Sequence, residues 1–451
     1  MRKNRIFLSG VSTLLVAATT VTAANAAPPK PNVIVILSDD MGYGDLGCHG
    51  CKDIRTPHID SLAAAGIRCT SGYAAHSFCS PTRASLVTGR YQHRFGHENN
   101  PKWEPDNDNL GLPLGEVTIA DVMKEAGYVT GAVGKWHLGA APRFHPNRRG
   151  FTDYFGFLGG GHVYLPGRQG TAEYVIPLMR NQESITETEY LTDAFSREAV
   201  AFIERNKAKP FFLYLAYNAV HGPLQAPAKY LDRFSRIADP NRRTYAAMLS
   251  AMDDGVGQVL ARLRELNIEE KTLVFFLNDN GGPLHKNAST NTPLRGAKGQ
   301  LIEGGIRVAF MVYWKGVLKP GIYDEPVSTI DLLPTIAAVS GAKVPASVKL
   351  DGVNFMPHLS GQLKTPPHER VFWRQGGGNV WAVREGRWKL VHNQQEGTRL
   401  FDLSKDIAEQ NDLAAQERPV VDRLTKAYET WNRDNIGPLW PPLLPARPQS
   451  K

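Results

Sequence analysis

The sequence lacks long apolar runs and clusters of basic residues. Beyond residue 26, no segment is long and apolar enough to cross a bilayer. The formal net charge is +8, and residues 1–26 hold three cations and no acids, so the remainder carries +8 − 3 = +5. Such an excess suits anionic substrates, but no run of lysines and arginines provides the dense charge that nucleic acids require. We therefore expect neither a nucleic-acid partner nor a membrane span.

Cysteine is also scarce, with 4 residues among 451. Cys48 and Cys51 have the spacing of a redox centre or of half a zinc site. No second pair of this spacing follows, and no thioredoxin-like strand precedes this one. We expect instead a disulfide between two of Cys48, Cys51 and Cys69, or simple buried thiols. The pairing stays open.

The N-terminus has the pattern of a secretory signal peptide. Three cations precede an apolar stretch at residues 6–21, and small residues follow at 24–26. An uncleaved anchor is the alternative, but the apolar stretch is short and interrupted by polar residues. We predict a signal peptide at residues 1–26 and an exported protein, either periplasmic or secreted.

Four runs of apolar, largely β-branched or aromatic residues predict strands that are buried on both faces of a sheet. A long segment at residues 242–266 repeats apolar residues at helical spacing, so it should cover one face of that sheet. We therefore predict an α/β fold with a mostly parallel sheet between layers of helices. The four runs are residues 31–37, 129–134, 211–216 and 272–277.

The chain changes character near residues 360–367, where it becomes polar and contains prolines. Short strands alternate with turns after this point, and an amphipathic helix follows. We expect a main domain at residues 27–365 and a small unit at residues 366–451, built from an antiparallel sheet plus a helix.

Polar side chains that can perform chemistry follow each of the four buried runs. Because the carboxyl ends of strands in an open α/β sheet border one crevice, these side chains should lie together. Three carboxylates and an amide suit a hard cation such as Ca²⁺ or Mg²⁺, whereas a solvated turn is the plainer interpretation of adjacent acids. The residues are Asp39 and Asp40, Lys135 and His137, His221, and Asp279 and Asn280.

A short helix is expected directly after Cys79. Ser80 can cap it, Pro81 fits its first position, and Gly89 can end it in a left-handed conformation. Cys79 would then lie just outside the positive end of the helix, with Arg83 about one turn behind it. Such a position favours an anionic group, although an ordinary capped helix with a buried cysteine has the same pattern.

The motif Cys-x-Pro-Thr-Arg at residues 79–83, followed by Leu-x-Thr-Gly-Arg at 86–90, resembles the signature of the formylglycine-dependent sulfatases. Two further segments resemble the same family, Asp-Asp-x-Gly-Tyr-Gly-Asp at 39–45 and Gly-Lys-Trp-His-Leu-Gly at 134–139. The segment at 294–299 is similar to the one that supplies a sulfate-binding lysine, here Lys298. Relatives often have glycine where this chain has Ala297.

This resemblance implies an alkaline-phosphatase-like fold and the hydrolysis of sulfate esters. It implies that a separate maturation enzyme oxidises Cys79 to formylglycine, an aldehyde whose hydrate is the nucleophile. It also implies Ca²⁺, with Mg²⁺ as the alternative, bound by oxygens of Asp39, Asp40, Asp279 and Asn280 and by residue 79.

The resemblance further implies a role for each remaining site residue. Arg83 and Lys135 would hold the hydrate, and Asp279 would take the proton from its attacking oxygen. His137 would later accept a proton so that sulfate can leave, and His221 or Lys298 would protonate the departing alcohol.

Two other functions fit part of the pattern. One is a phosphomonoester or phosphonate-ester hydrolase of the same superfamily, and the other is a non-catalytic protein that binds sulfated glycans. Polar loops at residues 91–103 and 157–170 favour a sulfated carbohydrate as substrate. His97, His162 and Arg168 are candidates for sugar contacts, and the oligomeric state is not indicated.

Overall fold

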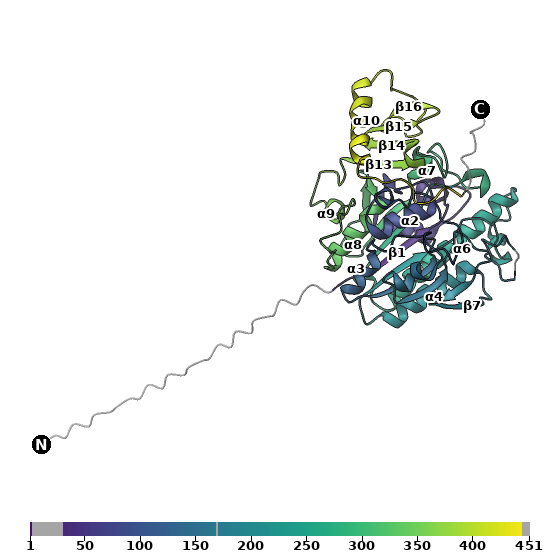
Figure 1. The fold of residues 1–451 in the computed structure, drawn as a ribbon. Coiled ribbons are helices and arrows are strands. Elements are labelled where there is room, and N and C mark those ends of the chain that lie inside the picture. Colours follow the sequence, from purple (N-terminus) through teal and green to yellow (C-terminus); the bar gives the residue numbers. More distant parts are fainter. Residues whose placement is uncertain (2–29, 168–169, 444–451) are drawn as a thin grey trace.

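The computed structural model describes Met1, residues 30–167 and residues 170–443 (Figure 1). The expected signal peptide at 1–26 therefore falls, apart from Met1, outside the described residues. The main body is a ten-stranded sheet in the order β11-β2-β10-β9-β1-β8-β4-β5-β6-β7. Its strands are β1 (Asn32–Ser38), β2 (Ile67–Cys69), β4 (Val129–Lys135), β5 (Asp153–Phe157), β6 (Leu178–Arg180), β7 (Glu183–Ile185), β8 (Phe211–Ala216), β9 (Thr272–Asn278), β10 (Phe310–Tyr313) and β11 (Gly321–Tyr323).

The first strand in the sequence lies in the centre of the sheet. β1 runs parallel to β8 on one side and to β9 on the other, and β4 and β5 continue the parallel pairing beyond β8. β10 is antiparallel to β9, and the edge strands β6 and β7 are also antiparallel. All of β1 is buried, as its run of β-branched residues predicts. The predicted mixed, mostly parallel α/β sheet is confirmed.

Helices cover both faces of this sheet because alternate residues of each strand point in opposite directions. Ile34 and Ile36 pack into the core formed with α1, α4 and α6, whereas Val33 and Val35 pack into the core with α2, α3 and α8. The helices are α1 (Pro57–Ala65), α4 (Leu191–Asn206) and α6 (Pro240–Glu265) on one face, and α2 (Cys79–Thr88), α3 (Ile119–Glu125) and α8 (Leu332–Ser340) on the other.

A second, four-stranded antiparallel sheet follows near the C-terminus, with α10 packed against it at the top of Figure 1. The rings of Trp381 and Tyr428 stack with their centroids 4.1 Å apart and join sheet to helix. The predicted antiparallel sheet plus helix is therefore present. Its elements are β13 (Arg370–Gln375), β14 (Val380–Glu385), β15 (Trp388–Asn393), β16 (Gly397–Asp402) and α10 (Arg418–Asn432).

A buried ion network joins this second sheet to the main body. Nζ of Lys389, on β15, lies 2.8 Å from Oε1 of Glu303 and 2.9 Å from Oε1 of Glu409. Glu303 begins α7 (Glu303–Ile306), and its other carboxylate oxygen accepts a hydrogen bond from the hydroxyl of Tyr73. All three charged side chains are inaccessible to solvent, so the network holds the small sheet against the start of α7.

The remaining short elements are β3 (Gly72–Tyr73), β12 (Val327–Ser328), α5 (Ala228–Leu231) and α9 (Met356–Leu359). Within residues 30–167 and 170–443, no helix has both the length and the apolar character needed to cross a membrane.

The four cysteines all lie in the described residues, and all are free thiols. The expected disulfide among Cys48, Cys51 and Cys69 is therefore wrong, and the alternative of unpaired thiols is correct. The reason is local: the Cys51 thiol donates to Asp53, and Cys69 faces the core from β2.

Candidate active site

The carboxyl ends of β1 and β9 bring three carboxylates to the helix that begins at Cys79. β1 and β9 pair in register as far as Ser38 and Asn278, so the following residues, Asp39 and Asp279, lie side by side. Asp39, Asp40, Asp279 and the thiol of Cys79 offer ligand atoms that are all within 4.8 Å of one another. All four residues are buried. The predicted meeting of strand ends therefore occurs.

The start of α2 differs from the prediction by one residue. The helix begins at Cys79 itself, with Phe78 as its N-cap, so Ser80 is not the cap. The Ser80 hydroxyl instead donates to the carbonyl of His137 (2.6 Å), and the Ser80 amide donates to the side chain of Asn100 (3.0 Å). The helix ends as predicted, at Gly89 in a left-handed conformation with φ 66°.

Arg83 supports the carboxylates rather than the thiol. Its guanidinium donates to Oδ2 of Asp279 from Nε (3.1 Å) and from Nη2 (2.8 Å), and to the carbonyl of Lys135 from Nη1 (3.1 Å). It makes no hydrogen bond to the Cys79 thiol in the described part of the chain. Asp279, which directly follows β9, places an opposite charge within reach of this guanidinium.

Two lysines complete the ring of charge around Cys79. Nζ of Lys135, at the end of β4, lies 2.5 Å from Oδ2 of Asp39. The other oxygen of this carboxylate, Oδ1, lies 3.6 Å from the Cys79 sulfur. Nζ of Lys298 lies 3.1 Å from the same sulfur and 2.7 Å from Oδ1 of Asp40. The thiol is thus in contact with both signs of charge.

The two histidines approach from different elements. β4 ends at Lys135, and His137 beyond it has a left-handed backbone with φ 60°. Its ring is buried, and neither nitrogen has a hydrogen-bond partner among the described residues. His221 follows β8 and places Nε2 3.6 Å from Oδ2 of Asp40, while Nδ1 faces the carbonyl of Gly222.

These surroundings set the charge of the thiol and of His137. Burial raises the pKa of the Cys79 thiol to about 12, although the charges of Lys135 and Lys298 act in the opposite direction. Burial and the neighbouring Lys135 also hold the pKa of His137 well below its usual value. Cys79 is thus a neutral thiol at pH 7, and His137 is a neutral imidazole.

The carboxylates differ from one another. Burial and the adjacent Asp39 raise the pKa of Asp279 to about 6. Burial alone would also raise the pKa of Asp40, but the charges of Lys298 and His221 outweigh it and hold that pKa well below its usual range. Burial together with a like charge accounts for the first shift, and opposite charges account for the second.

The donor set fits a divalent metal ion. Asp39, Asp40 and Asp279 offer carboxylate oxygens, and Oδ1 of Asn280 is buried without a hydrogen-bond partner in the described chain. The amide nitrogen of Asn280 donates to Asp40 at 2.7 Å, which turns Oδ1 toward the opposite side. A buried acceptor without a donor is costly, and a hard cation would satisfy it.

Residues 31–342, well over half of the chain, match the family model described as Sulfatase. The chain belongs to the sulfatase family. Human arylsulfatase A is 34% identical over 438 residues, which cover 90% of this chain and 83% of the relative. The N-acetylgalactosamine-6-sulfatase of Canis lupus familiaris is also 34% identical, over 93% of this chain and 88% of its own. The protein is thus a sulfuric ester hydrolase.

Solved structures agree with this assignment. The crystal structure of Ps i-CgsB superimposes with a TM-score of 0.86 at 41% identity, over 91% of this sulfatase and 95% of that chain. A second structure of Ps i-CgsB contains k-i-k-neocarrahexaose and is 40% identical. The phosphate-ester hydrolase and the non-catalytic binding protein are therefore not favoured.

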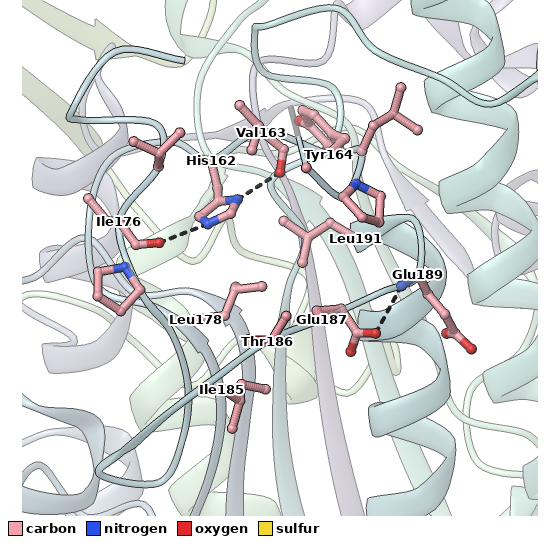
Figure 2. Close-up of a pocket in the computed structure, with 15 residues that line it drawn as sticks. His162, Val163, Tyr164, Ile176, Leu178, Ile185, Thr186, Glu187, Glu189 and Leu191 are labelled. Carbon is pink, nitrogen blue, oxygen red and sulfur yellow. Dashed lines mark hydrogen bonds between the residues drawn. The ribbon is translucent and has the colours of Figure 1, made fainter. Parts of the chain in front are cut away.

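The candidate sugar contacts of this sulfatase are mostly engaged elsewhere. His97 is fully buried, with Nε2 2.6 Å from the hydroxyl of Ser80, so it cannot face a substrate. Figure 2 shows the ring of His162 between two backbone carbonyls, those of Val163 (2.7 Å) and Ile176 (2.9 Å), beside a cavity of about 300 Å³. Neither ring nitrogen is left for a sugar. Arg168 lies outside the described residues.

Two residues that border the sulfatase site belong to none of the motifs above. A Cβ atom on Gly160 would lie 2.9 Å from Nε2 of His137, so only glycine leaves this ring in place. The ring of Tyr174 packs over Gly161 and lies 6.2 Å from the ring of His221. In the sequence, the one indication of these two residues is the glycine run at 159–161, since glycines permit the close approach of another group.

Proposed function

We propose that this sulfatase removes sulfate from a sulfated oligosaccharide or polysaccharide, using a formylglycine made from Cys79 and a Ca²⁺ ion. The observation that carries the proposal is the position of the Cys79 side chain. Its sulfur is 3.1 Å from the Lys298 ammonium and 3.6 Å from the Asp39 carboxylate. A reactive group at this point is in contact both with the metal-ligand cluster and with a cation that can attract an anionic substrate.

The charge of the site supports a divalent ion. Three carboxylates face three cations, so the residues alone are close to neutral. Ca²⁺, with Mg²⁺ as the alternative, would supply the charge that acidifies a hydroxyl and attracts the sulfate group. The residues that would hold it are Asp39, Asp40, Asp279 and Asn280, together with residue 79.

A formylglycine would supply two hydroxyls when hydrated, one to attack sulfur and one to let the sulfate leave. Asp279 can accept the first proton because it is an acid of raised pKa beside residue 79. His137 can accept the second, since both of its ring nitrogens lack partners in the described chain. Arg83 and Lys135 hold Asp279 and Asp39 in place.

The leaving alcohol needs a proton donor. Lys298 and His221 both approach Asp40, at 2.7 Å and 3.6 Å, so they lie on the same side of the site. Either one can deliver a proton to an oxygen that departs in line with the attack. His221 is additionally fixed by Tyr164, whose hydroxyl lies 2.8 Å from the His221 carbonyl.

A sulfated carbohydrate is the substrate class we favour. Ps i-CgsB, 40% identical over 91% of this chain, was solved with k-i-k-neocarrahexaose, and a curated relative is named N-acetylgalactosamine-6-sulfatase. We further propose removal of residues 1–26 on export to the periplasm or the medium, and a boundary between units at residues 365 and 366.

The test has two parts. The peptide that spans residues 69–83, taken from protein made together with a maturation enzyme, is analysed by mass spectrometry. We expect the thiol to be replaced by an aldehyde, and an active preparation with an intact thiol would overturn this. Sulfate release is then compared between p-nitrophenyl sulfate, p-nitrophenyl phosphate and a panel of sulfated saccharides. Preference for the phosphate would favour the phosphate-ester alternative.

A further inference from the structure

A second cavity, which we call the sheet-side cavity, lies between the Lys298 segment and the small C-terminal sheet. Its volume is about 250 Å³. One wall comes from the chain around Gly299, and the others come from β13, β14, β15 and the start of β16. It is lined by Arg295, Gly299, Gln300, Leu301, Ile302, Gln375, Val380, Val391, Asn393, Glu396 and Arg399.

This cavity and the candidate active site share one segment of chain. Gly299 lines the cavity, and it directly follows Lys298, whose ammonium contacts the Cys79 sulfur. The Gly299 amide donates to the carbonyl of Ser77 at 3.0 Å, and Nε2 of Gln375 donates to the carbonyl of Gly299 at 3.2 Å. A ligand that occupies both the cavity and the candidate active site would therefore lie along one segment of chain, which these hydrogen bonds hold in place.

Two arginines give the cavity a positive charge. Arg295 is half-buried and is oriented by backbone carbonyls, because Nε donates to Ala408 (3.0 Å) and Nη2 donates to Glu409 (2.5 Å). Within the described residues it has no carboxylate partner, and Nη1 makes no hydrogen bond. Among residues 30–167 and 170–443, the one ion-pair partner of Arg399 is Glu396 on the surface. This interaction has a small net energy, and an incoming anion can replace it.

The rest of the lining suits a sugar ring. Leu301, Ile302 and Val391 form an apolar floor. The side-chain amide nitrogens of Gln300 and Asn393 make no hydrogen bond among the described residues, since only their oxygens are used. Apolar carbon, free amides and planar guanidinium groups together match the CH face, the hydroxyls and the sulfate of a sulfated sugar.

We propose that the sheet-side cavity binds a second sulfated sugar unit of the substrate, next to the unit that loses its sulfate at residue 79. Arg399 and Arg295 pair with the sulfate of this neighbouring unit, which remains uncleaved. The inference rests on the proposed action on a sulfated carbohydrate. It adds that this sulfatase selects chains sulfated on adjacent units over singly sulfated ones.

The test compares substrates of different length. Wild type, Arg399→Ala, Arg399→Lys and Arg399→Glu are assayed for kcat/KM on p-nitrophenyl sulfate and on sulfated oligosaccharides of two to six units, including k-i-k-neocarrahexaose. We expect Arg399→Ala to lower kcat/KM about tenfold more on the oligosaccharides than on the aryl sulfate. Arg399→Lys should recover part of this loss, Arg399→Glu should deepen it, and added salt should reduce the difference between variants.

Arg423→Ala is the matched control, because Arg423 is an exposed arginine of the same C-terminal unit and pairs with Glu385 outside the cavity. It should not alter the ratio between substrates. The affinity of the unconverted Cys79 form for the same oligosaccharides is measured by calorimetry. If sulfate is released but Arg399 variants bind and turn over every oligosaccharide as wild type does, the cavity proposal is wrong and the proposed function stands. If oligosaccharides bind in an Arg399-dependent way but no sulfate is released, the cavity proposal stands and the proposed function is wrong.

Discussion

The ammonium nitrogen of Lys298 lies 3.1 Å from the sulfur of Cys79 and 2.7 Å from Oδ1 of Asp40. One cation therefore connects the position of the proposed nucleophile with a proposed metal ligand. Unlike Lys135, which ends a central strand, Lys298 belongs to a loop whose backbone is bonded to Ser77 and Gln375. Changes in the small sheet can thus reach the site through this loop.

Replacing Lys298 with alanine should lower kcat by about 10²–10³-fold, because a positive group aimed at developing charge in a buried site makes a large contribution. The measurement is the rate of sulfate release at saturating substrate. Lys286→Ala, an exposed lysine on a nearby turn, is the control and should keep the wild-type rate. A Lys298→Ala protein with an unchanged kcat would contradict the assigned role.

Adding Ca²⁺ to chelator-treated protein should raise Tm, because an ion that binds only the folded state stabilises it by about 2.7 kcal/mol at 100 times Kd. Asp40→Asn should lose most of this rise, since the variant removes a buried anionic ligand. Asp434→Asn, at an exposed position, should retain it. Equal Tm with and without Ca²⁺ in the wild type would argue against the metal site, whatever the activity.

Gly160→Ala should lower kcat without unfolding the protein. The added Cβ would lie 2.9 Å from Nε2 and 3.0 Å from Cε1 of His137, so the ring must move away from the site. Gly115→Ala is the matched control, because nothing lies within 4 Å of its Cβ position. The two variants should show similar Tm values but different rates of sulfate release. Equal rates would mean that the His137 ring tolerates displacement.

Lys389→Met should destabilise the protein by about 3–5 kcal/mol, because it leaves the buried carboxylates of Glu303 and Glu409 without their shared cation. Urea unfolding provides the measurement. Lys405→Met, on the surface of the same unit, should change stability by less than about 0.5 kcal/mol. The double variant Lys389→Met with Glu409→Gln should recover part of the loss, and a result no better than the single variant would contradict this explanation.

The His368 ring should make stability depend on pH. Burial acts against its charged form, but the Asp331 carboxylate 2.8 Å away outweighs burial and raises the pKa of His368. A raised pKa in the folded state adds stability that is complete below the unfolded value of about 6.5 and is lost as pH rises through the folded value. The difference in unfolding free energy between wild type and His368→Gln should therefore be larger at pH 6 than at pH 9. His285→Gln, at an exposed position, should show no such trend.

Features that depend on local pattern could be predicted from the sequence. The buried strands follow from runs of β-branched residues, and the meeting of Asp39 with Asp279 follows from the parallel pairing of β1 and β9. Thr118 and Asp121 form a capping box at the start of α3, and both residue types are typical of such a box. In each case the determining residues are neighbours in the sequence or ends of regular strands.

Features that depend on distant partners could not be predicted. Ser80 has the residue type of an N-cap, but its amide and hydroxyl are taken by Asn100 and His137. Arg83 contacts Asp279, which is 196 residues away, rather than Cys79. His97 looks like a surface residue in its polar segment, yet Trp440 packs against its ring. Such choices are decided by tertiary packing, which no window of the sequence contains.

The central place of β1 has a consequence for how the chain is made. β1 leaves the ribosome first, but its register pairs Asn32 with Thr272, so one flank stays open until some 240 further residues have been added. During that time this edge of β1 exposes unpaired backbone groups that can pair with another chain. An arrested or proteolysed chain that stops before β9 lacks Asp279 as well as the flank, and it should aggregate rather than give a partly working product. Detectable release of sulfate therefore indicates that synthesis has continued beyond β9.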